Sequence, residues 1–220
     1  FTHLRDEGNN VFDSVEEAME FAQQVGVHVQ IVHMKLSGTD NWGGATKALD
    51  LLSRARAGNV KIDCDIYPYT AASNPLKNLF PPWIQEGGVH AMIARLEQQG
   101  VRDRLREAVE TEGLNNFGRI PDWDAIRISI SPDLPQHAGQ TISDIAAGRG
   151  AGGLETALDY IVEDRGQTRV LVNSISENDV KTFVRSREVM IGSDGNSVAP
   201  YGTTGQGKPH PRFYGTFAKV

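Results

Sequence analysis

The sequence predicts an α/β fold built on a parallel sheet, and three observations carry this prediction. Strand and helix patterns alternate over residues 1–66, and each predicted helix ends in a tight turn that leads into a strand. A longer loop follows each strand, which is typical of strand–helix–strand units. The apolar residues of the strand predicted over 27–33 are too continuous for a half-exposed strand, so we expect cover on both of its faces.

The first helix is predicted by apolar residues that recur at helical spacing. These residues are Val15, Ala18, Met19, Ala22 and Val25. We expect Asp13 to cap the start of this helix, with Glu16 three residues later completing a capping box. Gly26 is expected to end the helix, because a glycine commonly closes the last turn.

The second helix is predicted over 45–57, and Gly58 follows it as the closing residue. A third strand is predicted over 60–66, and it ends in the run Tyr67-Pro68-Tyr69-Thr70. The order up to this point is strand, helix, strand, helix, strand. This order favours a single parallel sheet with its helices as crossover connections.

The alternation then breaks, and we interpret residues 74–150 as an insertion in one domain of 1–220. Three prolines and a glycine pair make 74–88 irregular, whereas 90–112 has helical periodicity with dense charge. The run over 125–130 alternates apolar and polar residues, as in a half-exposed strand. The insertion is therefore expected to carry helices and at least one strand of its own.

The remaining predicted elements restore a regular pattern after the insertion. They are a helix over 154–163, a strand over 169–172, a helix over 177–185 and a strand that ends on Asp194. A loop rich in glycine and proline follows over 196–211, and such loops commonly close over a pocket.

Composition excludes several classes of protein. A length of 220 residues suffices for one domain with a substantial core, and a net charge of -6 argues against a nucleic-acid partner. No apolar run approaches the roughly 20 residues that a membrane span needs, so no membrane association is expected. The single cysteine, Cys64, rules out an internal disulfide framework. With no visible signal peptide, these features predict a cytoplasmic location.

Three predicted strands end on side chains that bind metals or move protons. His3 follows the first residues of the chain, His33 ends the strand over 27–33, and Asp194 stands in the run Ile191-Gly192-Ser193-Asp194-Gly195. In a (β/α) barrel the active-site residues come from the C-terminal ends of several strands. We therefore predict one shared site, with a metal held partly by His3 and His33 and with Asp194 as proton carrier. The alternatives are two unrelated histidines at strand ends and a turn aspartate.

Further residues near these strand ends are candidates for binding substrate. Lys35 and Arg212 can bind an anionic group, and a guanidinium can hold a carboxylate through two hydrogen bonds, but either can also be solvated. Tyr67 and Tyr69 flank a proline at a strand end, where a phenol can donate to an oxyanion or simply pack. Cys64 is interpreted as a buried side chain and not as a ligand.

The residues after His3 are also expected to take part in the site. Metal-bound imidazoles commonly donate their second ring N–H to a neighbouring acceptor. We therefore expect Arg5, Asp6 and Glu7 to form a network that orients His3.

Several short runs of sequence stand in a fixed order along nearly the whole chain. They are 2–8 (THLRDEG), 30–35 (QIVHMK), 41–43 (NWG), 65–71 (DIYPYTA), 81–83 with 86–88 (PPW, EGG), 190–195 (MIGSDG) and 210–212 with 214–217 (HPR, YGTF). Together they resemble the N-acyl-D-amino-acid deacylases, or D-aminoacylases, of the amidohydrolase superfamily. The resemblance implies a TIM-like (β/α)8 metal-dependent hydrolase barrel, of which this chain holds strands five to eight, with the insertion between strands seven and eight.

The resemblance also implies roles for single residues. His3 and His33 match the metal ligands of strands five and six, and Asp194 matches the aspartate of strand eight that takes a proton from the metal-bound water. Lys35 and Tyr67 match residues that hold the substrate.

Arg212 matches a residue that holds the substrate's carboxylate, and Ser73 is a further candidate for substrate binding. Tyr69 remains an alternative to Tyr67, because spacing alone does not separate the two tyrosines.

The implied activity is hydrolysis of the linear amide bond of N-acyl-D-amino acids, with zinc as cofactor and a small-molecule substrate. The alternatives are a cyclic amidase of the dihydroorotase or hydantoinase kind, and a non-catalytic fragment. The family's N-terminal half, with its His-x-His pair and its bridging cysteine, has no counterpart in these 220 residues. Cys64 stands on the strand matching strand seven, so two histidines and an aspartate fall one ligand short of a secure catalytic zinc site.

Overall fold

A computed structural model describes residues 1–220, and the chain divides into two compact units. The parallel-sheet unit comprises Phe1–Thr70, Ile175–Ser197 and Pro211–Val220. The antiparallel-sheet unit comprises Ala71–Ser174 and Val198–His210. Each unit has its own sheet and its own buried apolar cluster.

The sheet of the parallel-sheet unit has the order β1-β2-β6, with all neighbours parallel. Its strands are β1 (Val29–Ile31), β2 (Ile62–Ile66) and β6 (Val189–Ile191). Thr2 forms an isolated parallel bridge with Ile31, so the start of the chain extends the sheet beside β1. The four segments therefore stand in the predicted order, and the predicted parallel sheet is confirmed.

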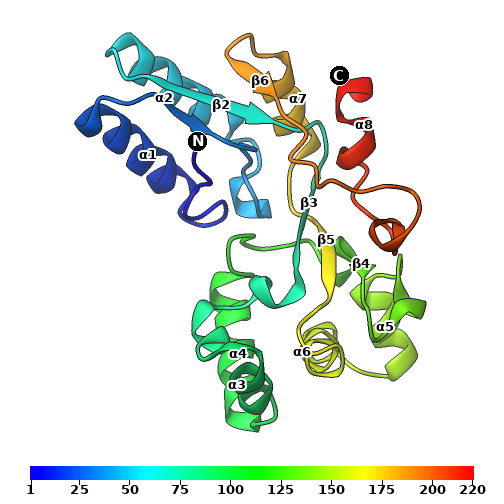
Figure 1. Ribbon diagram of the computed structural model, residues 1–220. Helices are drawn as coiled ribbons and strands as arrows, with labels where there is room; N and C mark the ends of the chain where they lie inside the picture. Colours follow the sequence, from blue (N-terminus) through cyan, green and yellow to red (C-terminus); the bar gives the residue numbers. More distant parts are fainter. The chain divides into compact units, whose positions relative to one another are not determined.

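Three helices of this unit pack in a row along the sheet (Figure 1): α1 (Val11–Val25), α2 (Ala45–Ala57) and α7 (Glu177–Arg185). The helix α1 contacts β1 and α2, whereas α2 and α7 both contact β2. Buried aliphatic side chains from these helices and strands form one cluster. A fourth helix, α8 (Arg212–Lys219), ends the chain.

The helix boundaries of this unit agree with the predictions at most ends. The bounds of α2 and α7 are those predicted, and Gly26 ends α1 in the left-handed conformation with φ 72°. The predicted capping box is wrong, because α1 begins at Val11 and places Asp13 inside its first turn. The helix α8 was not predicted, because its residues show no helical pattern.

The antiparallel-sheet unit contains β3 (Ala71–Pro75), β4 (Ile126–Ile130) and β5 (Arg169–Asn173) in the order β3-β5-β4. Both pairings are antiparallel. The predicted strands over 125–130 and 169–172 are therefore confirmed as β4 and β5. The strand β3 was not predicted, and its last two residues fall at the start of the stretch 74–88 that was expected to be irregular.

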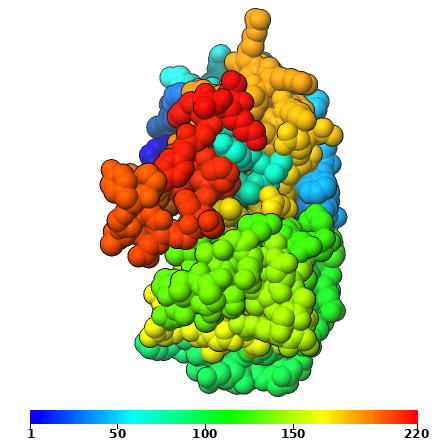
Figure 2. Space-filling model, turned by 90° about the vertical axis from the view of Figure 1, so that its right-hand side faces the viewer, coloured from blue at the N-terminus to red at the C-terminus, as the bar shows by residue number.

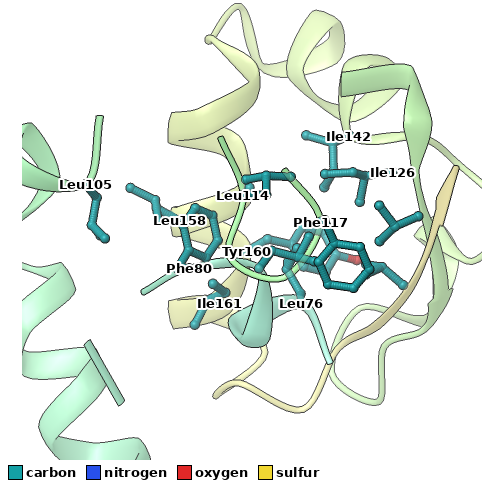
Figure 3. Close-up of a cluster of buried hydrophobic side chains, with 14 of the residues drawn as sticks. Leu76, Phe80, Leu105, Leu114, Phe117, Ile126, Ile142, Leu158, Tyr160 and Ile161 are labelled. Atoms are coloured by element: carbon teal, nitrogen blue, oxygen red, sulfur yellow. The ribbon is translucent and has the colours of Figure 1, made fainter. Parts of the chain in front are cut away.

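Four helices belong to the same unit: α3 (Gly88–Leu96), α4 (Gln99–Glu112), α5 (Ile142–Arg149) and α6 (Gly153–Glu163). The single helical stretch predicted over 90–112 is thus two helices. Phe80, Phe117 and Tyr160 are almost fully buried among aliphatic side chains (Figure 3). The helices and loops of this unit, drawn in green and yellow-green, form a continuous surface in the space-filling view (Figure 2).

The predicted insertion at about 74–150 lies within the antiparallel-sheet unit, which begins before and ends after those limits. Residues 198–210 of the glycine- and proline-rich loop also belong to this unit, and Lys208 donates its main-chain N–H to the Ser129 carbonyl at 2.8 Å. None of the helices combines the length and apolar character needed to cross a bilayer.

Candidate functional site

The parallel arrangement of the strands brings three predicted site residues to one edge of the parallel-sheet unit. His3 follows the bridge residue Thr2, His33 lies two residues after β1, and Asp194 lies three residues after β6. Because parallel strands share one direction, all three residues stand at C-terminal strand ends. This is the edge where (β/α) barrels carry their active sites.

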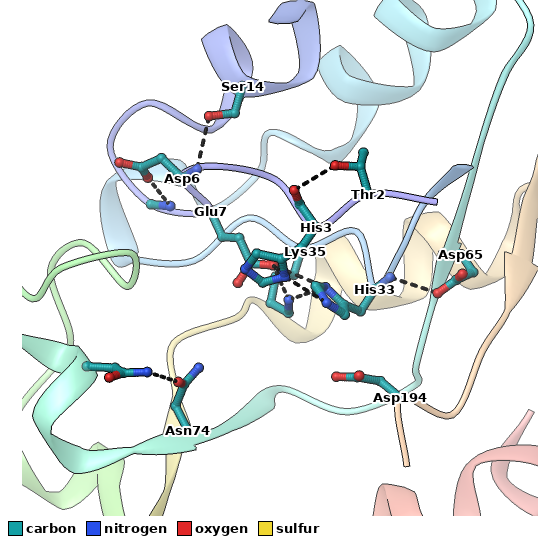
Figure 4. A network of polar contacts seen from close by, with 12 residues as sticks. Thr2, His3, Asp6, Glu7, Ser14, His33, Lys35, Asp65, Asn74 and Asp194 are labelled. Carbon is teal, nitrogen blue, oxygen red and sulfur yellow. Dashed lines mark hydrogen bonds and ion pairs between the residues drawn. The ribbon is translucent and has the colours of Figure 1, made fainter. Parts of the chain in front are cut away.

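His3 and His33 face each other through ring nitrogens (Figure 4). Nδ1 of His3 lies 2.9 Å from Nε2 of His33, with the ring centroids 4.6 Å apart. Two nitrogens bound to one tetrahedral zinc at about 2.1 Å lie roughly 3.4 Å apart, so a small opening of the pair would admit an ion. The side chain of His3 is 55% exposed and that of His33 is 11% exposed.

A buried carboxylate, Glu7, completes this cluster of potential ligand atoms. Its Oε1 lies 3.1 Å from Nδ1 of His33 and 3.7 Å from Nδ1 of His3, and it also accepts a short hydrogen bond from Lys35. Burial opposes ionisation of Glu7, but the nearby Lys35 ammonium and His33 outweigh it and lower the pKa of Glu7 to about 2. Glu7 is therefore an ionised carboxylate near neutral pH.

The backbone at two of the site residues is in the left-handed conformation. His33 has φ 42° and Asp194 has φ 44°, a region that non-glycine residues rarely occupy. Asp65, at the end of β2, accepts a hydrogen bond from the main-chain N–H of His33 at 2.7 Å. Its own carbonyl accepts from the N–H of Met34 at 2.6 Å. Asp65 thus holds the unusual turn that aims the His33 ring.

Asp194 pairs with a buried arginine on the other side of the site. Nη2 of Arg212 lies 2.8 Å from Oδ2 of Asp194, and the guanidinium carbon lies 4.5 Å from the centroid of the Tyr67 ring. Tyr67 is almost fully buried, and burial raises the pKa of its phenol. Asp194 does not belong to the cluster of ligand atoms formed by His3, Glu7 and His33.

The predicted substrate residues differ in where the structure places them. Tyr67 and Arg212 lie beside Asp194, whereas the Lys35 ammonium is buried against Glu7 and 2.8 Å from Nδ1 of His33. Ser73 belongs to the antiparallel-sheet unit, where it pairs with Leu171 across β3 and β5.

Arg5 and Asp6 do not orient His3 as expected, whereas Cys64 is buried as predicted. Arg5 does not orient His3, because its guanidinium binds Glu17 on α1 at 2.6 Å. Asp6 accepts from the main chain of Gly8 at 2.7 Å and so shapes the loop instead. Cys64 is buried and its thiol pKa is raised to about 12 by that burial, consistent with a packing role.

Two residues of the site were missed or misassigned from the sequence. The sequence predicts no role in the site for Asp65, and it predicts that Glu7 orients His3 and not His33. The signal available for Asp65 was its place at the C-terminal end of a predicted strand. No local pattern in the sequence shows which of the two imidazoles Glu7 contacts.

The chain is similar to bacterial deacylases that act on N-acylated D-amino acids. An N-acyl-D-glutamate deacylase and a D-aminoacylase, both from Alcaligenes xylosoxydans xylosoxydans, are 26% and 27% identical to the chain over 219 residues. The alignments cover 100% of this chain and 34% of each relative. The chain therefore spans about a third of the length of the curated relatives it matches. No family model matches the chain.

Solved structures give the same result. The N-acyl-D-glutamate deacylase from Bordetella bronchiseptica, solved with zinc and a phosphonate inhibitor, matches with a TM-score of 0.66 at 26% identity over 98% of this chain and 35% of that chain. A D-aminoacylase, whose structure defines a novel subset of amidohydrolases, matches with a TM-score of 0.65 over 99% and 35%. The predicted resemblance and the predicted partial barrel of an α/β hydrolase are confirmed.

Proposed function

We propose that this chain is part of a zinc-dependent hydrolase that cleaves the linear amide bond of N-acyl-D-amino acids. The observation that carries the proposal is the facing pair of nitrogens, Nδ1 of His3 and Nε2 of His33, 2.9 Å apart at the strand ends. Relatives matched over the whole chain are named for this reaction. Because the chain covers a third of their length, the activity is proposed for a protein that contains this chain.

The ligand atoms that this chain supplies fit a zinc ion. Imidazole nitrogens are zinc ligands, and a catalytic zinc site needs three protein ligands. His3 and His33 would supply two of them. A related D-aminoacylase is described with a binuclear metal centre, and a related deacylase was solved with zinc. A zinc ion held here would polarise the scissile carbonyl and lower the pKa of the attacking water.

Asp194 is the proposed proton carrier of the reaction. Its carboxylate is 34% exposed, so one face of it is open to a substrate or water while Oδ2 binds Arg212. It would accept a proton from the water that attacks the amide carbonyl and then deliver that proton to the leaving nitrogen. The ion pair with Arg212 restrains the carboxylate on one side.

The substrate's carboxylate is assigned to the cationic side of the site. Arg212 is buried at 6% exposure and stacks on Tyr67, so its guanidinium is held in place before any substrate arrives. A guanidinium in this position can bind a carboxylate, and the Tyr67 hydroxyl can donate to the acyl oxygen. Lys35 adds positive charge to the same site.

The linear substrate is favoured over a cyclic amide by the curated relatives. They are named for N-acyl-D-glutamate, for N-acyl-D-aspartate and, more broadly, for D-amino acids. All three names describe a free carboxylate beside the amide, which is the group that a buried arginine would bind.

The experiment measures D-amino acid release from N-acetyl-D-amino acids by the zinc-loaded protein that contains this chain and by its Asp194→Asn variant. Asparagine tolerates the left-handed backbone at this position and keeps an oxygen that can accept from Arg212, so the change removes the charge and the proton acceptor. We expect turnover to fall roughly 10²- to 10⁴-fold with bound zinc unchanged. Asp50→Asn, at an exposed position on α2, is the matched control and should keep full turnover. Equal turnover by Asp194→Asn, or ring-opening activity without linear deacylation, would contradict the proposal.

A further inference from the structure

We propose that Tyr69 is a positioning residue for Arg212, because it holds the helix α8 through a close contact with Gly215. The inference rests on the role of Arg212 in the proposed function, where its guanidinium binds the substrate's carboxylate. It also gives different roles to Tyr69 and Tyr67, which sequence spacing alone does not separate.

One face of the helix α8 contacts the two tyrosines that follow β2. The guanidinium carbon of Arg212 lies 4.5 Å from the centroid of the Tyr67 ring. Nζ of Lys219 lies 4.3 Å from the centroid of the Tyr69 ring, and Gly215 faces the Tyr69 hydroxyl. Positions 212, 215 and 219 are three and four residues apart, so they share one face of a helix. Tyr67 thus meets the first turn of α8, and Tyr69 meets the two turns after it.

The contact between Tyr69 and Gly215 leaves no room for a side chain at position 215. A Cβ added there would lie 2.5 Å from the Tyr69 hydroxyl oxygen, well inside van der Waals contact. The N–H of Gly215 donates to the Pro211 carbonyl at 2.9 Å, and its backbone is helical. The close approach of the hydroxyl, and not the backbone conformation, therefore requires a glycine here.

The Tyr69 ring is itself held in place by its own surroundings. It is half-buried and packs against a small buried cluster that includes Tyr67 and Ile175. Its N–H donates to the Tyr67 carbonyl at 2.9 Å, which fixes the main chain between the two tyrosines. A side chain at position 215 would therefore displace α8 and not the ring.

A displacement of α8 would reach the guanidinium of Arg212. Arg212 lies one turn before Gly215, and its carbonyl accepts from the Thr216 hydroxyl at 2.9 Å. Its guanidinium lies over Tyr67 and 2.8 Å from Asp194, so its position is set before a substrate binds. A guanidinium binds a carboxylate through hydrogen bonds of fixed direction, and a shift of about 1 Å weakens such binding.

The test introduces a clash at Gly215 and then removes it at Tyr69. Gly215→Ala adds the methyl group, and alanine by itself favours the helix over glycine. Tyr69→Phe, added to Gly215→Ala, removes the hydroxyl that the methyl group meets and keeps the ring. Tyr214→Phe, added to Gly215→Ala, is the matched control, because Tyr214 is 56% exposed on the same helix and its loss of a hydroxyl leaves the clash.

Two measurements are made on the zinc-loaded protein that contains this chain. The KM for N-acetyl-D-amino acids reports binding of the carboxylate, and the proton resonances of the Arg212 guanidinium report its position over the Tyr67 ring. We expect Gly215→Ala to raise KM roughly tenfold and to shift the Arg212 resonances. Adding Tyr69→Phe should return both towards the values of the unchanged protein, whereas adding Tyr214→Phe should restore neither.

An unchanged KM in Gly215→Ala would overturn the inference, even if thermal unfolding showed a loss of stability, because the contact would then only support the fold. A raised KM that Tyr69→Phe does not lower would overturn it as well. If the unchanged protein releases no D-amino acid, the proposed function fails. The Arg212 resonances, which need no turnover, then decide alone whether Tyr69 positions that side chain.

Discussion

Both units bury polar side chains, but they bury different kinds. In the parallel-sheet unit the buried polar groups include the charged side chains Glu7, Lys35, Asp65 and Arg212, most of which contact one another or the two histidines. In the antiparallel-sheet unit they are mainly serine and threonine hydroxyls, such as Thr141 at the start of α5. A buried charged side chain needs a partner, whereas an exposed one is stabilised by water. The gathering of buried charged side chains at one strand edge therefore identifies the candidate site.

The only buried carboxylate of the antiparallel-sheet unit illustrates the contrast. Asp164 accepts from the Asp133 main chain at 2.7 Å and from the Thr168 hydroxyl at 2.5 Å. These main-chain and hydroxyl donors satisfy it, and no cluster of potential metal ligands includes it. A buried carboxylate whose partners are other titratable groups, such as Glu7, is a candidate for function. A buried carboxylate whose partners are main-chain and hydroxyl donors, such as Asp164, has a structural role.

The largest effect expected from this comparison is on the stability of the antiparallel-sheet unit. Leu158→Ala removes a fully buried side chain from α6, and such a cavity destabilises a domain by about 2–5 kcal/mol. Urea unfolding should show this loss, while the zinc affinity of the folded protein stays unchanged. If the zinc affinity also fell, the packing of the antiparallel-sheet unit would affect metal binding, and the contrast between the two units would be wrong.

A smaller effect on stability, but a direct one on the site, is expected at Gly192. A Cβ there would lie 2.7 Å from Oδ1 of Asp65, the oxygen that accepts the His33 N–H. Gly192→Ala should therefore destabilise the protein by about 1–3 kcal/mol and weaken zinc binding. Urea unfolding and chelator competition measure the two effects.

The matched control for this change is Gly148→Ala in α5, where an added Cβ meets nothing within 4 Å. That variant should keep its zinc affinity and gain up to about 1 kcal/mol, because alanine is the better helix former. If Gly192→Ala behaves like the control, Asp65 does not hold the His33 turn.

The smallest effect is expected at the cap of α5. The Thr141 hydroxyl accepts from the N–H of Asp144 at 3.1 Å, and the Asp144 carboxylate accepts from the N–H of Thr141 at 2.9 Å. Thr141→Ala should cost about 1 kcal/mol in thermal or urea unfolding. Thr111→Ala, at an exposed position near the end of α4, should change stability by less than about 0.5 kcal/mol. Equal losses in both variants would show that the cap contributes nothing specific.

The elements best predicted from the sequence are those with periodic apolar residues and a glycine at the end. The bounds of α2 followed from its spacing and Gly58, and the end of α1 followed from Gly26. By contrast, β3 has the sequence Ala-Ala-Ser-Asn-Pro and no strand pattern. It becomes a strand because β5 pairs with it along its whole length, which is a tertiary effect.

Part of the candidate site was predictable from the sequence, and part was not. The meeting of His3 with His33 followed from their positions at the ends of predicted neighbouring strands, one strand–helix–strand unit apart. The contact of Glu7 with His33 did not, because the direction of its side chain depends on the loop before α1 and its bond to Ser37. The pairing of Arg212 with Asp194 also depended on α8, a helix with no signal in the sequence.

The left-handed backbone at His33 and Asp194 has a consequence for how this chain tolerates change. A non-glycine residue in this conformation destabilises the folded state by about 1–2 kcal/mol, and glycine would remove most of that cost. Selection for heat resistance alone would thus favour glycine at the two positions to which the proposed function gives a metal ligand and a proton carrier. Thermostable variants of this chain should therefore be sought elsewhere, and any that arise at these positions should be inactive.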